Sequence, residues 1–182
     1  MRFGMCLAYT TLPGRGDAGL LFSDLAAGLK ARGRRVVGLV QAEARGPDRH
    51  PCDMDLRLVP GGRPIRISQS LGAGSRGCRL DAGALELAAV EVGRALARGA
   101  GFLIVNKFGK LEAQGRGFAG VFAEALGVGI PAIVAVNDLN LEAFLDFTEG
   151  LATPLAPDRD VLLAWALGAS DPAAMEARLE AR

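Results

Sequence analysis

The residues with the most evident chemistry lie in FLIVNKFGKLEAQGRGF, residues 102–118. Directly after an apolar run typical of a buried strand, this segment contains Asn106, Lys107, Lys110 and Arg116. The chain has 21 lysines and arginines, but lysine occurs only at positions 30, 107 and 110. Because lysine presents a compact point charge rather than a planar fork, its placement here favours an anion-binding site. Solvated lysines in a surface loop are the alternative interpretation.

Neighbouring segments offer further groups to an anion. Arg79 precedes Asp81, where a helix is expected to begin, and backbone N–H groups at a helix start attract anions. A surface ion pair is the other interpretation of Arg79. The expected ligand is a tetrahedral oxyanion, bound without a bridging magnesium ion and without any catalytic residue. The candidate ligand-binding residues of these segments are Lys107, Lys110, Arg79, Asn106, Arg116, Ser68 and Gln69.

A glycine-rich loop, GRGDAG at residues 14–19, follows the first apolar run and precedes a helical pattern. A phosphate-binding loop has this order, but it also requires a lysine and a Ser or Thr, and both are missing. Gly16 and the helix start could still favour an anion through backbone N–H groups, whereas Asp17 would repel it or cap the helix. As a dinucleotide-binding fingerprint the loop is weak, because it does not follow the strand closely.

Buried strands that alternate with helices must position these residues. Apolar runs predict strands at residues 3–9, 35–41, 102–106 and 130–136. The runs lack an alternating pattern, which indicates a mainly parallel, twisted sheet with helices on both faces. In such folds ligands bind beyond the carboxyl ends of the strands. The loops expected at that edge are 10–17, 69–80 and 106–116.

Periodic apolar residues predict the helices, and a turn signal predicts one hairpin. Helices are expected at residues 17–32, 81–98, 116–127, 140–147, 158–167 and 172–181. The alternating segment around Pro60, Gly61 and Gly62 predicts an antiparallel hairpin insertion over residues 54–68.

The bulk composition indicates a single α/β domain over residues 1–182. A formal net charge of +1 gives no support for a nucleic-acid partner or an acidic membrane surface. No apolar run approaches the ~18 residues that span a bilayer, so no membrane insertion is expected. Together with the absence of a signal-peptide pattern, this favours a cytoplasmic protein. The alanine-rich helices leave homo-oligomer formation open.

The cysteines Cys6, Cys52 and Cys78 are odd in number, which is typical of reduced thiols rather than of a disulfide framework. His50 is the only histidine, and its spacing to Cys52 and Cys78 matches no zinc motif. No metal site is therefore expected.

The order of elements resembles the small nucleoside-triphosphatases of thermophiles in the P-loop superfamily. Those proteins have an acidic D-E-x-G-K-x-E segment after a central strand, where this chain has NKFGKLE. More closely, the chain resembles a bacterial domain-of-unknown-function family whose genes often lie near molybdate-transport genes. The stretches that carry this resemblance, over most of residues 3–150, are GLVQ, CDMDL, ISQSLG, GCRLD, NKFGKLEAQGRGF and GIPAIVAV.

The resemblance implies a P-loop-NTPase-like fold with a degenerate phosphate-loop (Walker) motif. An active triphosphatase needs acids after the central strand to hold magnesium, and Asn106-Lys107 stands in their place. The expected function is non-hydrolytic oxyanion binding. Molybdate, molybdenum metabolism and contacts with molybdate-transport or cofactor-assembly proteins are implied by the genomic context. The alternative is a nucleotide-binding protein or a nucleoside-triphosphatase that uses unconventional residues, such as Glu112 or Asp53.

Overall fold

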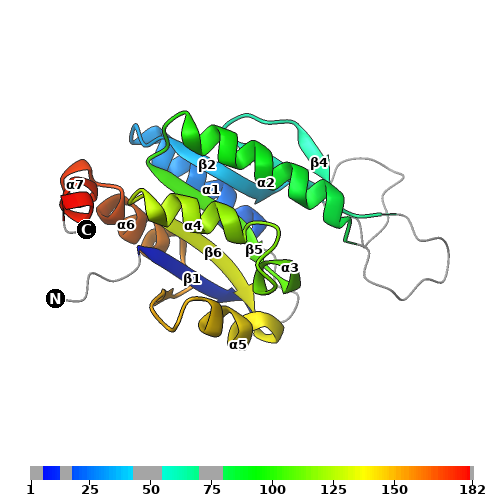
Figure 1. Cartoon of the computed structure of the whole chain (residues 1–182). Coiled ribbons are helices and arrows are strands. Elements are labelled where there is room, and N and C mark those ends of the chain that lie inside the picture. The colour runs from blue at the N-terminus through cyan, green and yellow to red at the C-terminus, as the bar shows by residue number, and fades with distance from the viewer. Residues whose placement is uncertain (1–5, 13–17, 43–54, 70–79, 181–182) are drawn as a thin grey trace.

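The computed structural model describes residues 6–12, 18–42, 55–69 and 80–180 (Figure 1). Within these residues the strands are β1 (Leu7–Leu12), β2 (Val36–Gln41), β3 (Asp55–Val59), β4 (Pro64–Arg66), β5 (Phe102–Phe108), β6 (Ala132–Asn137) and β7 (Thr153–Leu155). They form one sheet in the order β4-β3-β2-β5-β6-β1-β7. Strands β2, β5, β6, β1 and β7 are parallel, and β3 and β4 are antiparallel. The mainly parallel sheet and the hairpin are both confirmed.

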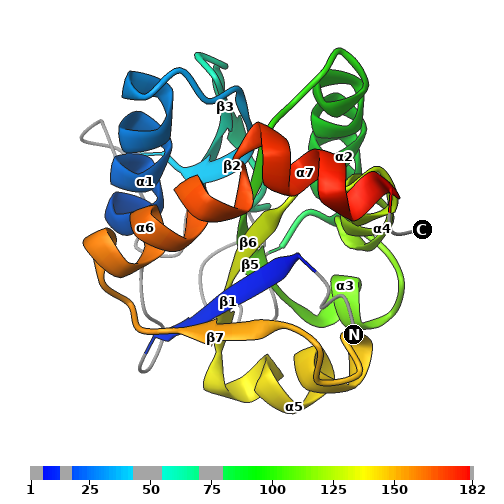
Figure 2. The ribbon, with the colours of Figure 1, turned by 90° about the vertical axis from the view of Figure 1, so that its left-hand side faces the viewer.

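Helices cover both faces of the sheet (Figure 2). The helices α1 (Gly19–Ala31) and α6 (Arg159–Ala169) lie on one face, and α7 (Pro172–Glu180) contacts α6. On the other face lie α2 (Ala82–Ala97), α4 (Ala119–Gly127) and α5 (Asp138–Phe147). The short helix α3 (Lys110–Ala113) follows β5 and contacts α5.

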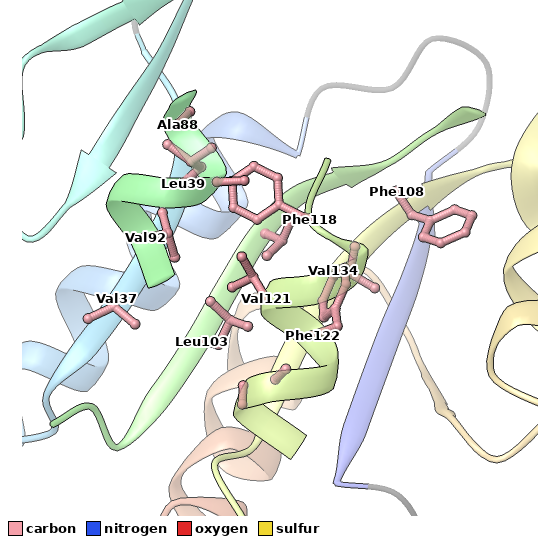
Figure 3. Packing of buried hydrophobic residues seen from close by; sticks show 14 of the residues in the cluster. Val37, Leu39, Ala88, Val92, Leu103, Phe108, Phe118, Val121, Phe122 and Val134 are labelled. Atoms are coloured by element: carbon pink, nitrogen blue, oxygen red, sulfur yellow. The ribbon is translucent and has the colours of Figure 1, made fainter. Parts of the chain in front are cut away.

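Two apolar clusters, one on each face, hold the layers together. Strand β5 contributes to both, since Leu103 and Val105 face α2 and α4 while Phe102 and Ile104 face α1 and α6. Figure 3 shows the first cluster, in which side chains of β2, β5 and β6 pack against α2 and α4. Trp165 belongs to the second cluster and packs edge-on against Phe102. Because the strands are buried on both faces of the sheet, their sequences do not alternate between apolar and polar residues.

Several predicted boundaries are wrong. The first described strand continues to Leu12 instead of ending at residue 9, because Thr10, Thr11 and Leu12 all pair with β6. Residues 3–5 of the predicted strand lie outside the described residues. Strand β5 continues beyond residue 106 to Phe108, and α4 begins at Ala119 instead of residue 116. Strand β7 and helix α3 were not predicted, and they are only 3 and 4 residues long. Tertiary pairing rather than local preference defines these ends.

In the described parts of the chain, no helix is both long and apolar enough to cross a membrane.

Candidate functional site

A β-bulge at the carboxyl end of β5 contains Asn106 and Lys107. Val105 pairs with Val134 and Phe108 with Val136, so two residues of β5 lie opposite one residue of β6, Ala135. The Asn106–Lys107 peptide bond is cis. Asn106 is only 8% exposed, whereas Lys107 is exposed. Bulges redirect side chains and are frequent beside active sites, and this one turns Lys107 out of an otherwise buried strand.

Lys110 lies on the same edge of the sheet as Lys107. It is the first residue of α3 and is exposed. Two residues lie between the two positions along the chain, so their Cα atoms are at most about 11 Å apart. Both side chains are exposed beyond the buried part of β5, although Lys107 still belongs to the strand, and the anion site itself stays a prediction.

Glu112 stabilises the connection that follows β5 by accepting hydrogen bonds from its backbone. The side chain is 2% exposed; its Oε2 accepts a hydrogen bond from the Gly109 N–H at 3.0 Å and its Oε1 one from the Phe118 N–H at 3.1 Å. Burial raises the pKa of Glu112 above its usual value of 4.5, and the nearby carboxylate of Glu86 raises it further. The hydrogen bonds from the backbone offset part of this rise. The carboxylate therefore points into the protein.

The buried carboxylate of Glu112 also requires glycine at position 117. The φ of Gly117 is +57°, which favours glycine, and a Cβ at this position would collide with Oε1 of Glu112. The close approach of a buried carboxylate therefore explains the glycine at position 117.

Arg116 lies beside a carboxylate of α2. Its Nε is 3.7 Å from Oε1 of Glu86, and the same oxygen accepts a hydrogen bond from the Gly117 N–H at 2.9 Å. The arginine side chain is 56% exposed. Glu86 therefore offsets part of the charge that Arg116 would bring to an anion, and it ties this connection to α2.

Ser68 and Gln69 lie at the start of α2. Ser68 is 8% exposed and forms an isolated bridge with Leu80, and Nε2 of Gln69 donates to the Leu80 carbonyl at 3.3 Å. Asp81 caps α2 as predicted, because its Oδ1 accepts a hydrogen bond from the Ala84 N–H at 3.0 Å. The predicted ligand-binding residues Gly16, Asp17 and Arg79 lie outside the described residues, as does Asp53 of the alternative interpretation. His50, Cys52 and Cys78, for which no metal site is expected, also lie outside them.

Thr10 is a polar residue of this edge that the sequence analysis did not select. It pairs with Ala135, the same residue of β6 that lies opposite the bulge, so Thr10, Ala135 and Asn106-Lys107 form a row across three adjacent strands. Thr10 is 0% exposed, and its Oγ1 has no hydrogen-bond partner in the described part of the chain. The sequence signal is a pair of threonines that directly follows an apolar run.

Both cationic and acidic side chains are exposed at this edge: Lys107 and Lys110 follow β5, and Asp138 follows β6. Within residues 6–12, 18–42, 55–69 and 80–180, no group of three or more His, Cys, Asp or Glu side chains could hold a metal ion.

Comparisons with known proteins give one family and one fold. The family model DUF2478, described as a protein of unknown function, matches residues 7–165. The molybdenum import ATP-binding protein ModC 2 of Bradyrhizobium diazoefficiens is 38% identical over 151 residues, which are 82% of this chain and 17% of that protein. The solution structure of a human cancer-related nucleoside triphosphatase has a TM-score of 0.60 at 17% identity, covering 96% of this chain and 98% of the human one. This last likeness shows a P-loop-NTPase-like fold.

Proposed function

Since the chain belongs to the DUF2478 family and is similar to a molybdenum import ATP-binding protein, we propose that it binds a tetrahedral oxyanion without hydrolysing a nucleotide. Molybdate is the first candidate for this anion, and the proposed role is molybdenum handling in the cytoplasm. The chain spans only 17% of the length of that relative, so the activity in the relative's name belongs to a much larger protein.

The observation that carries the proposal is the distribution of charge after β5. Residues 102–118 contain one carboxylate, Glu112, and both of its oxygens accept backbone hydrogen bonds in the interior. Arg116 lies beside Glu86, whereas Lys107 and Lys110 form no ion pair within the described residues. The exposed charge of residues 102–118 is therefore mainly positive, and Asp138 at the start of α5 adds one exposed carboxylate at the same edge of the sheet.

This charge distribution favours an oxyanion over a magnesium–nucleotide complex. Magnesium is usually held by carboxylate oxygens and water, and a neighbouring ammonium group repels it. An ammonium group instead forms short, charge-assisted hydrogen bonds with the oxygens of an anion. In the proposed site Lys107 and Lys110 supply the charge, and Asn106 and the hydroxyl of Thr10 supply neutral groups from the same row of the sheet.

Nucleotide binding is the second candidate function. The printed name of the relative includes ATP binding, and the fold is similar to that of a nucleoside triphosphatase. Calorimetric titration with ATP and ADP, each with and without magnesium, separates this candidate from the first. Tight binding of ATP that requires magnesium would favour it over oxyanion binding.

The direct test is to titrate Lys107→Ala and Lys110→Ala with molybdate, tungstate, sulfate and phosphate by calorimetry. Charge-assisted hydrogen bonds contribute roughly 1.5–3 kcal/mol each, so each variant should bind molybdate about tenfold to a hundredfold more weakly than the parent. Affinity should also fall as salt rises, because partly exposed charges are screened over ~8–10 Å.

Arg94→Ala is a charge-matched control for this test. Arg94 is exposed on α2 and lies outside the candidate site, so this variant loses one positive charge without losing a proposed contact. If Arg94→Ala weakens binding as much as the lysine variants do, only the overall charge matters. If the parent binds none of the four anions, the two lysines are ordinary solvated side chains and the proposed function is wrong.

A further inference from the structure

A cavity of about 310 Å³ lies at the opposite end of the sheet from Lys107. Its walls come from the last turns of α1 and α2, the start of β2 and the end of β3. Val36 pairs with Phe102 at the first residues of β2 and β5, so the cavity is at the amino edge of the parallel strands.

The charged side chains that line the cavity all carry a positive charge: Lys30, Arg34, Arg35 and Arg98. The carboxyl ends of α1 and α2 meet here, and each contributes about half a negative charge. Together they offset roughly one of the four positive charges. The hydrogen bond from Nη2 of Arg35 to the Arg98 carbonyl, 3.0 Å long, is part of this compensation. An excess of positive charge remains.

Arg34 adds a second, independent feature. Its Nε is buried and has no hydrogen-bond acceptor among the described residues. The carboxylate paired with this guanidinium, that of Asp171, is 3.7 Å from Nη2 and is itself half exposed. Since Nε itself is closed to solvent and the side chain is 25% exposed, it is the accessible remainder of the guanidinium that can meet an anion in the cavity.

The remaining walls are apolar and restrict the size of a ligand. They include Val36, Val37, Val59 and Ala95. A volume of about 310 Å³ is near the lower end of the ~300–1,000 Å³ found for small-molecule sites. The three guanidinium groups favour planar, bidentate recognition of phosphate or carboxylate, and the excess charge favours the more highly charged phosphate.

We propose that this cavity is a second anion site that binds a small phosphate-bearing molecule, such as a sugar phosphate or a diphosphate. Its phosphate contacts Lys30, Arg98 and Arg34, and any apolar part lies against Val36 and Val59. The site does not involve Lys107 or Lys110, so it stands independently of the proposed function.

The test is a titration of the ¹⁵N-labelled full chain followed by amide NMR shifts, with pyrophosphate, ribose 5-phosphate and acetate as probes. Pyrophosphate and ribose 5-phosphate should produce saturable shifts at Gly99 and Gly101, and acetate should not. The double variant Lys30→Gln/Arg98→Gln should bind at least about tenfold more weakly, because it loses two charged contacts. The side chains of Lys30 and Arg98 are both exposed, so the two changes should leave the fold intact. Arg94→Gln, on the helix α2 that ends at Arg98, is the matched control and should bind like the parent.

The same spectra distinguish this site from the one after β5. Shifts of Gly99 and Gly101 that persist in Lys107→Ala/Lys110→Ala support the second site. If the phosphates shift only Gly109, Gly115 and Gly117, the second site does not exist, while the first remains supported. If the parent shows no saturable shift near Gly99, or Lys30→Gln/Arg98→Gln binds as tightly as the parent, the inference is overturned.

Discussion

Glu112 is the only acidic residue of the segment NKFGKLE. In this chain its carboxylate is buried and bonded to the Gly109 and Phe118 N–H groups, so it holds the loop instead of facing a ligand. Lys107 shows the opposite behaviour. It lies in the β-bulge, and its side chain is exposed although the strand is otherwise buried. Burial thus gives the charge of Glu112 a structural role, whereas the exposed charge of Lys107 is a candidate for ligand binding.

The buried carboxylate makes stability depend on pH in a defined direction. The pKa of Glu112 is raised in the folded protein above its usual 4.5, so the unfolded chain releases this proton first as pH rises. The contribution of Glu112 to the free energy of unfolding therefore falls as pH rises from 4.5 through the raised pKa, and it is constant above that interval.

Glu112→Gln removes this titration while it keeps the size of the side chain. Urea unfolding of parent and variant between pH 4 and pH 8 should show the parent losing stability relative to the variant as pH rises. Other titrating groups are common to both chains and cancel in the difference. A difference that does not change with pH, or that moves in favour of the parent, would contradict the raised pKa.

The pairing of strand β2 with β5 depends on a close approach of the two backbones at Gly38. Gly38 has a φ of +141°, and a Cβ at this position would collide with the backbone of Ile104 in the neighbouring strand β5. A backbone neighbour cannot rotate away as a side chain can. Glycine at position 38 is therefore a condition for the β2–β5 pairing that places the carboxyl end of β5 in the sheet.

Gly38→Ala should consequently lower the free energy of unfolding by about 3 kcal/mol or more. Gly93→Ala is the matched control, because Gly93 lies within α2 and a Cβ there meets only Glu124 Oε2 at 3.7 Å, an ordinary contact. The control should gain about 0.5–1 kcal/mol from the better helix propensity of alanine. Denaturant titrations give both values, and equal effects of the two changes would refute the argument.

The whole molecule combines a nucleoside-triphosphatase-like fold with a lysine-bearing segment after the carboxyl end of β5. In that fold hydrolysis requires a phosphate-loop lysine, a hydroxyl and acids that organise magnesium. The sequence GRGDAGLL lacks the lysine and the hydroxyl, and the acid that follows β5 is buried. Shared architecture therefore does not imply shared chemistry.

We expect the purified chain to turn over ATP and GTP with magnesium far more slowly than the ~1–100 s⁻¹ typical of kinases. Phosphate release, measured for the parent and for Lys107→Ala, tests this expectation. Turnover in that range that is lost on Lys107→Ala would contradict the non-hydrolytic function. Turnover that is equal in both chains would instead indicate a contaminating enzyme.

The sequence alone determined the layered α/β architecture, the hairpin around Pro60 and the cap at Asp81, because apolar runs, turn residues and caps act locally. It also located the cationic segment after β5. It could not reveal the strand order, the bulge at Asn106-Lys107 or the row that includes Thr10, since these arise from pairing between distant segments.

Only the tertiary structure decided which charges face solvent and which are used internally. The sequence shows Glu112, Arg116 and Lys107 as three charged residues of one loop, yet the fold buries the first, places the second beside Glu86 and exposes the third. It also brings Arg98 beside Lys30, Arg34 and Arg35, which are close together in sequence, around one cavity. Burial and pairing of a side chain depend on neighbours that are remote in the chain, and local sequence carries no signal for them.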